Sequence, residues 1–358
     1  MNSLKKFDSS KWLSVESVGM VSSIGLNAPS CCAAIRAGIS RFEEIPFHDH
    51  FGNPIIAAPA IEAVPNRQGY QRTIQLLVLA IRECILSHPA HRKYIPQKVC
   101  LLIHIDTLDR PDFPENLLDY MAADINEGLG EIAPDRIEIY PEGKTGFFRS
   151  LIRARKILND SHFDACIIAA GDSLVNGRML AFLENNDRLK TEHNSDGVIP
   201  GEGAGALWVS RFSRQVKSML IVAGIGLNKE LSVLEKDKPT LGIGLANAIK
   251  ESLKDAGIPL HSIDFRIGSI AGERLDFMEA STALARVQRV HKDHFELWLP
   301  AEQLGDTGVA LPACMTIIAA VAFSKGYAPG RSALVFSSSR SAERAASIVL
   351  STTGLHNA

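Results

Sequence analysis

The sequence lacks the features of a secreted, membrane-spanning or nucleic-acid-binding protein. Its 38 Lys and Arg nearly balance its 40 Asp and Glu, so the composition does not favour nucleic acid or an anionic membrane as a partner. Residues 1–10 are polar and contain no apolar core of the kind that a signal peptide has. No apolar run reaches the roughly 18 residues that a membrane span needs. We therefore expect a cytoplasmic protein without a membrane span.

Cysteine and histidine are few and poorly spaced for structural roles. Most of the six cysteines lie in apolar runs, and their spacing fits neither a disulfide framework nor a zinc site: Cys31, Cys32, Cys84, Cys100, Cys166 and Cys314. We expect reduced thiols in the core. His48-Asp49-His50 could ligate a metal, but alternating residues in a proline-rich loop are usually solvated. His291 and His294, near Asp293, have no evident third ligand. The sequence therefore predicts no metal and no cofactor.

The chain has 358 residues, 46% hydrophobic and 22% charged, which suits a globular protein of two domains or one large duplicated domain. Apolar runs of strand length alternate with helical patterns, and this alternation predicts an α/β fold with largely parallel sheets. Segment 42–68 carries four prolines and is expected to be a loop. The expected strands are 12–20, 99–105, 136–140, 165–170, 206–209, 219–226, 264–269, 332–337 and 345–350. The expected helices are 30–37, 70–86, 115–127, 145–158, 241–256, 276–289 and 312–324.

The stretch at 196–209, DGVIPGEGAGALWV, carries glycine at alternate positions before an apolar run. In a strand, Gly201, Gly203 and Gly205 would leave one face at backbone level, so that another backbone can lie close against it. The stretch resembles the DGFVMGEGAG-type segment of the β-ketoacyl synthases, which are condensing enzymes of the thiolase superfamily. SVGMVSSIG, AIRAGIS and FDACIIAAGDS resemble further segments of that family in the same order.

The resemblance implies a thiolase-like fold, α/β, with two pseudo-repeated halves in five layers. We place the halves at 1–215 and 216–358. In this family a cysteine at a helix N-terminus is the nucleophile, because the helix end stabilises thiolate and oxyanion. Ungapped counting places that position near Lys144, with Thr145 beside it, and no cysteine occurs between Cys100 and Cys166.

The other catalytic positions of the family do not match either. The first family histidine, in HGTGT, falls on Gly268 or Ser269, and the run LGDTGVA puts Asp306 where the family's GHTxGAAG has histidine. The family's glycine-rich GFGGTN loop is replaced by SSSRSAE, which contains Arg340. We therefore expect no catalytic residue, and we interpret six residues as vestigial active-site positions: Lys144, Thr145, Gly268, Ser269, Asp306 and Arg340. We predict that Lys144 or Thr145 lies at a helix N-terminus and faces Asp306 and the Gly268–Ser269 loop across a shared cleft. If Lys144 and Asp306 come within contact, we expect them to pair as a structural ion pair.

Two other charged motifs have less specific interpretations. Gly143-Lys144-Thr145 resembles part of a phosphate-binding loop, but Glu138 stands where the full motif needs a glycine. An anion held by Lys144 at the helix N-terminus remains an alternative. Arg149, Arg153, Arg155 and Lys156 predict a solvated cationic helix face, with binding of an acidic protein as the alternative.

The mismatched catalytic positions predict a non-catalytic scaffold that binds a protein partner. AIRAGISRFEEIPF, GNPIIAAPA and LLIHIDTLDRPDFP also resemble a thiolase-like subgroup associated with type VI secretion, which implies an accessory or co-chaperone role in effector loading. One alternative is an inactive chain-length-factor-like subunit of a β-ketoacyl synthase, and another is an acyltransferase with altered chemistry at Lys144 and Asp306. The resemblance also implies a homodimer through the edge strand at 136–140, with a monomer docked on a different partner as the alternative.

Overall fold

The computed structural model describes residues 9–160, 162–230 and 241–352. Ten of its strands form one sheet in the order β10-β9-β11-β12-β8-β1-β7-β6-β4-β5. The strands of the N-terminal half are β1 (Leu13–Ser22), β4 (Val99–Ile105), β5 (Arg136–Pro141), β6 (Ala165–Ser173) and β7 (Glu202–Arg211). Those of the C-terminal half are β8 (Leu220–Lys229), β9 (Phe265–Gly268), β10 (Leu297–Trp298), β11 (Ser332–Ser338) and β12 (Glu343–Ser351).

The two halves of the sheet repeat one topology. If the strands of each half are numbered along the chain, both halves have the spatial order third, second, fourth, fifth, first. In both, the second strand pairs in parallel with the third and the fourth, and the remaining pairs are antiparallel. A short antiparallel pairing of β1 with β8 joins the halves. The expected pseudo-repeat is therefore present, but the expectation of largely parallel sheets is wrong, since the strand after β6 returns antiparallel.

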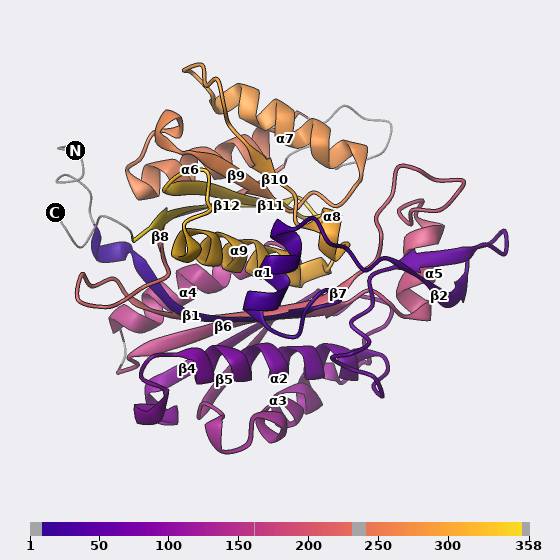
Figure 1. Ribbon diagram of the computed structural model, residues 1–358, viewed down its shortest axis with the longest axis horizontal. Helices are drawn as coiled ribbons and strands as arrows, with labels where there is room; N and C mark the ends of the chain where they lie inside the picture. The colour runs from indigo at the N-terminus through magenta and orange to yellow at the C-terminus, as the bar shows by residue number, and fades with distance from the viewer. Residues whose placement is uncertain (1–8, 161, 231–240, 353–358) are drawn as a thin grey trace.

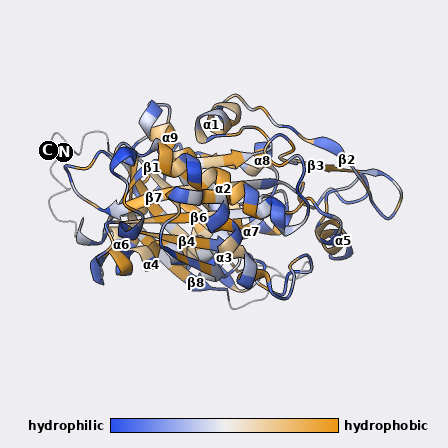
Figure 2. Cartoon of the chain, turned by 90° about the horizontal axis from the view of Figure 1, so that it is seen from below, coloured by the Kyte–Doolittle hydropathy of each residue, from blue (hydrophilic) through white to orange (hydrophobic). Residues whose placement is uncertain are grey.

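Helices and half-sheets stack in five layers, as Figure 1 shows. One outer layer contains α2 (Tyr70–Ser87) and α3 (Leu117–Leu129), and the other contains α6 (Ile243–Ala256) and α7 (Arg274–Val287). Between the half-sheets lie α1 (Ala28–Arg36), α4 (Gly146–Asp160) and α9 (Leu311–Lys325). In Figure 2 the hydrophobic colour gathers in the central strands of the molecule. The boundary that we placed at residue 215 falls between β7 and β8, although the division into two domains stays a prediction.

Helix α9 is apolar on every side because both half-sheets pack against it. All of its residues from Leu311 to Phe323 are buried. The segment Gly308–Lys325 is the one described segment long and apolar enough to cross a membrane, and 83% of it is buried inside the protein. The expectation that no apolar run reaches this length is therefore wrong, and the burial identifies the segment as a core helix.

Segment 42–68 is not a plain loop, which corrects the prediction. It contains the hairpin of β2 (Glu43–His48) and β3 (Pro54–Ala57). A helix that the sequence analysis missed, α5 (Gly177–Asn185), packs with this hairpin in a small separate core, and its N-cap Asn176 accepts a hydrogen bond from the Met179 amide. In Figure 1 this lobe projects on the right-hand side of the molecule.

The alternate glycines of β7 and the turn before it admit close backbone contacts, as predicted. A Cβ atom on Gly201 would lie 2.4 Å from the Leu304 carbonyl oxygen, and one on Gly205 would lie 3.3 Å from the Cys314 amide nitrogen. Beside this contact, the Gly201 amide donates to the Asp306 carbonyl (2.9 Å), and the Asp306 amide donates to the Ile199 carbonyl (2.8 Å). The glycine-rich stretch therefore holds Asp306 in place through its backbone.

Candidate functional site

The turn between β5 and α4 carries Lys144 and Thr145 directly before the first residue of the helix, Gly146. Gly143 has φ +66°, a left-handed conformation that glycine adopts without steric cost. The buried imidazole of His104 donates from Nε2 to the Gly143 carbonyl at 2.6 Å. A Cβ on Gly146 would lie 2.1 Å from Cε1 of that ring, so the turn requires glycine there. The predicted placement at a helix N-terminus is confirmed.

Lys144 and Asp306 form the predicted ion pair. The Lys144 Nζ lies 3.1 Å from Asp306 Oδ1, and the two side chains are 17% and 7% exposed. Burial acts to raise the pKa of Asp306, but the nearby cations of Lys144 and Arg188 outweigh it, so this pKa lies below its usual value. Asp306 is therefore an ionised carboxylate at neutral pH, and the Lys144 ammonium is already engaged with it.

Four further charged residues continue the network beside this pair. Arg188 donates from Nε and Nη2 to the two carboxylate oxygens of Glu273 at 3.1 and 3.0 Å. Arg340 also pairs with Glu273, and it lies 3.1 Å from Asp276. Burial acts to raise the pKa of Glu273, but the hydrogen bond from Arg188 and the charges of both arginines lower it below its usual value. Burial raises the pKa of Asp276 despite the proximity of Arg340 and Lys144.

We call these six residues the ionic cluster: Lys144, Arg188, Arg340, Glu273, Asp276 and Asp306. Three are cationic and three are acidic, and they come from segments that lie far apart in the sequence. The sequence analysis singled out Lys144, Asp306 and Arg340 but missed the other three. Arg188 follows a turn at the end of α5 in which Asp187 has φ +53°. No local pattern pairs Arg188 with Glu273, which lies 85 positions further along the chain.

The remaining predicted positions have their own hydrogen-bond partners or packing contacts. Thr145 donates from its hydroxyl to Glu343 at 3.2 Å. Ser269 donates to the Ser337 hydroxyl at 2.8 Å, and a Cβ on Gly268 would lie 2.7 Å from the Phe336 ring. Thr145 thus contacts a carboxylate rather than a histidine, while Gly268 and Ser269 link β9 to β11. The interpretation of these positions as vestigial catalytic positions stays a prediction.

A second buried set of charges supports the turn before α9. Arg110 pairs with Asp172 and, at 2.6 Å, with Asp112. Asp172 also accepts a hydrogen bond from the Val309 amide at 3.0 Å. Burial outweighs the charge of Arg110 and raises the pKa of Asp172 to about 6. These side chains tie the ends of β4 and β6 to α9, and the sequence analysis did not identify them.

Glu202 of the GEGAG run is structural. It is fully buried and pairs with Arg72 at 2.6 Å. It also accepts hydrogen bonds from the Ala60 amide (2.7 Å) and the Ser173 hydroxyl (2.5 Å). Its carboxylate oxygens are therefore occupied by partners within the chain.

The cysteines, the potential metal ligands and the arginines of α4 were also singled out by the sequence. All six cysteines are free and buried, as expected, and burial raises the pKa of Cys31 to about 11. Among the described residues, no group of three or more His, Cys, Asp or Glu could hold a metal ion. On α4, Arg149, Arg153 and Arg155 pair with Glu343, Glu142 and Asp255. This helix therefore does not present the free cationic face that the sequence suggested.

Comparisons with known proteins identify the fold. No protein-family model matches the chain, and no curated protein matches it either. Solved structures match it over nearly its whole length. One is the type II PKS acyl-carrier protein in complex with its ketosynthase bound to the hexaketide, AntDE:AntF (TM-score 0.78, 15% identity, 95% of this chain and 99% of that chain). The chain has the thiolase-like fold of the ketosynthases.

Two further structures show the same similarity. The ketosynthase from module 6 of the bacillaene synthase of Bacillus subtilis 168 matches with TM-score 0.75 and 13% identity, over 95% of this chain and 72% of that chain. The ketosynthase ApeO in complex with its chain length factor ApeC, from Xenorhabdus doucetiae, matches with TM-score 0.71 and 14% identity, over 95% and 98%. At these identities the similarity establishes the fold, and the function has to be argued from the site.

Proposed function

We propose that this protein is a non-catalytic, thiolase-like scaffold that binds a protein partner in the cytoplasm. The observation that carries the proposal is the ionic cluster at the N-terminus of α4. Acyl transfer in a condensing enzyme needs a nucleophile that is free to attack and bases that are free to take a proton. Lys144 and Asp306 instead neutralise each other at 3.1 Å. An acyltransferase with altered chemistry at these two residues would first have to break that pair.

An activity measurement tests the first half of the proposal. The purified chain is incubated with acyl-loaded acyl carrier protein and then analysed by intact-mass spectrometry, with an active ketosynthase as the positive control. We expect no covalent acyl adduct and no transfer. A stoichiometric adduct on any residue of segment 143–147 would overturn the non-catalytic assignment.

The edge of the sheet supports the second half of the proposal. Strand β5 is at the end of the sheet order in the N-terminal half and, among the described strands, pairs with β4 alone. Its outermost charges are paired along the strand, since Arg136 and Tyr140 both contact Glu138. A second thiolase-fold chain could therefore extend the sheet at this edge without leaving these charges unpaired.

Two identities for the partner follow from different observations. A chain-length-factor-like role, with an active synthase as partner, is favoured because one of the similar structures is a ketosynthase in complex with its chain length factor. A role in type VI secretion, with an adaptor or effector as partner, depends only on the N-terminal sequence patterns described above. Co-purification of the tagged chain from its native cell distinguishes the two roles. Recovery of an intact ketosynthase and a carrier protein supports the first, and recovery of a secretion adaptor supports the second.

A further inference from the structure

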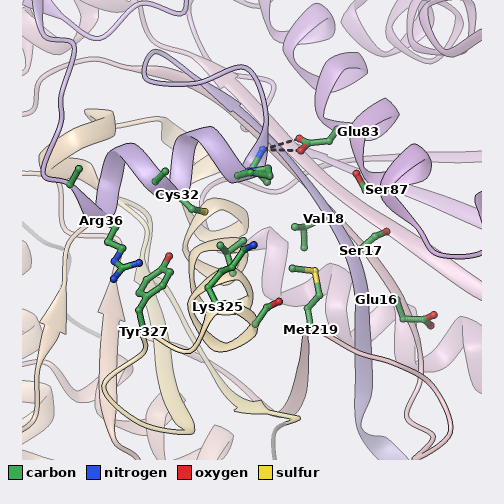
Figure 3. A pocket seen from close by; sticks show the side chains of 16 residues that line it. Glu16, Ser17, Val18, Cys32, Arg36, Glu83, Ser87, Met219, Lys325 and Tyr327 are labelled. Carbon is green, nitrogen blue, oxygen red and sulfur yellow. Dashed lines mark hydrogen bonds between the residues drawn. The ribbon is translucent and has the colours of Figure 1, made fainter.

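A cavity lies at the end of α9 opposite the ionic cluster. It has a volume of about 750 Å³ and is bounded by α1, β1, the C-terminal end of α9 and the segment before β8 (Figure 3). Asp306 stands before the first turn of α9, whereas Lys325 is its last residue, and 15 residues of helix span roughly 22 Å. This cavity is therefore separate from the ionic cluster, and what it binds does not depend on the proposed function.

The floor of the cavity is apolar. Val18 of β1, Cys32 of α1, Met219 and Val321 line it, and Figure 3 shows Val18 and Met219 near its centre. The volume lies within the range of roughly 300–1,000 Å³ typical of small-molecule sites. A smaller cavity of about 420 Å³ adjoins it, with Arg36 and Tyr327 in the lining of both. The lining of the smaller cavity also includes the carboxylates Glu296 and Glu302, so it is not part of the apolar space.

One end of the cavity carries positive charge. The Arg36 guanidinium lies 4.5 Å above the centre of the Tyr327 ring, and Lys325 stands nearby (Figure 3). Among the described residues, neither cation has an ion-pair partner, and the Tyr327 hydroxyl has no hydrogen-bond partner within the chain. Three donors thus border one end of an apolar space.

The acids of the cavity are already occupied. Glu83 accepts hydrogen bonds from the Met20 and Ala28 amides at 2.8 and 2.9 Å, so it caps the N-terminus of α1. Glu16 lies 3.1 Å from the His88 imidazole. Figure 3 shows both acids on the side of the cavity away from Arg36 and Tyr327. Their position and their partners leave the cationic end free to receive an anion.

We infer that this cavity binds an amphipathic anion, with a carboxylate or phosphate head at Arg36, Lys325 and Tyr327 and an apolar tail over Val18 and Met219. A buried apolar floor supplies affinity without regard to head group, and the cations supply the preference for negative charge. We therefore expect tight binding only of a ligand with both an anionic head and an apolar tail. The head and the tail can be tested separately.

Isothermal titration of the full chain with four probes of closely matched tail length tests the inference. The probes are decanoate, decyl phosphate, decanol and decyltrimethylammonium, each kept below its micelle concentration. We expect both anions to bind at least about tenfold more tightly than the neutral and cationic probes, because charge-assisted hydrogen bonds are made only by the anions. The tighter of the two anions identifies the head group. Equal binding of all four probes, or no binding of either anion, would overturn the inference.

Variants assign the binding to this cavity. Arg36→Gln with Lys325→Gln should weaken decanoate binding by about tenfold or more while leaving decanol binding unchanged. Met219→Trp should fill the floor and weaken all binding. The matched control is Arg178→Gln with Lys156→Gln, since both side chains are exposed and lie outside the cavity lining. Wild-type binding by the cavity variants, or an equal loss in the control, would show that the anion binds elsewhere.

Discussion

Replacing Lys144 with methionine tests whether the ionic cluster is a buried structural unit. The substitution keeps most of the side-chain volume but leaves the carboxylate of Asp306, which is 7% exposed, without its partner at 3.1 Å. Removal of one member of a buried ion pair typically costs about 3–5 kcal/mol. Lys144 is 17% exposed, and Arg188 also acts on Asp306, so we expect a loss in unfolding free energy nearer about 2–3 kcal/mol.

Equilibrium unfolding in urea at neutral pH measures this loss, and a double variant identifies its cause. Asp306→Asn removes the charge that Lys144 neutralises, so Lys144→Met with Asp306→Asn should be more stable than the sum of the single losses by about 1–3 kcal/mol. Lys156→Met is the matched control on an exposed lysine and should change stability by less than about 0.5 kcal/mol. If Lys144→Met behaves like this control, or if the two substitutions are additive, the pair does not act as a buried unit.

Three other predictions concern the buried histidine, the glycine-rich stretch and the sheet edge. Burial lowers the pKa of His104 to about 4 in the folded chain, whereas in the unfolded chain this imidazole has its usual pKa of about 6.5. Between these two pH values, His104 therefore takes up a proton only in the unfolded chain. Stability should therefore fall by about 3 kcal/mol between pH 6.5 and pH 4, and His104→Gln should flatten that dependence in urea titrations. Gly201→Ala would put a Cβ 2.4 Å from a backbone oxygen and should cost about 1–3 kcal/mol in the same assay, whereas Gly177→Ala, which meets only a side chain at 3.2 Å, should be nearly neutral. Light scattering of the purified chain should give the mass of a dimer, and a monomer at tens of micromolar would contradict pairing through β5.

Much of the fold could be predicted because its strongest patterns are local. The amphipathic run that forms α2 and the apolar run that forms β4 lie within two residues of where the sequence placed them. The hairpin at β2 was missed because its prolines indicate a loop. Pro46 is tolerated there because, within the part of the chain that the structure describes, β2 pairs with β3 alone, so one edge of the strand needs no ladder hydrogen bond. Helix α5 was missed because it is short and packs on this hairpin rather than on the main core.

In the candidate site, too, some residues could be predicted from the sequence and others could not. Lys144 and Asp306 lie 162 positions apart, and only the resemblance to a known family placed them together. The resemblance assigned no role to Arg188, Glu273 or Asp276, and charged residues usually indicate solvated positions. Arg188 follows α5, whereas Glu273 and Asp276 lie at the N-terminus of α7, so they meet only when these elements pack together, which a one-dimensional pattern does not record.

A ketosynthase fold can contain the ionic cluster because its main packing contacts lie elsewhere. The sheet is held to α9 by glycine contacts such as Gly205 against the Cys314 backbone, and to its second half by the pairing of β1 with β8. Neither contact involves Lys144 or the residues that pair with it. Groups kept reactive in an active site are left without partners, and this costs stability. Charges that pair with one another do not carry this stability cost. The ionic cluster is therefore compatible with a protein whose surfaces, rather than a reactive site, serve its function.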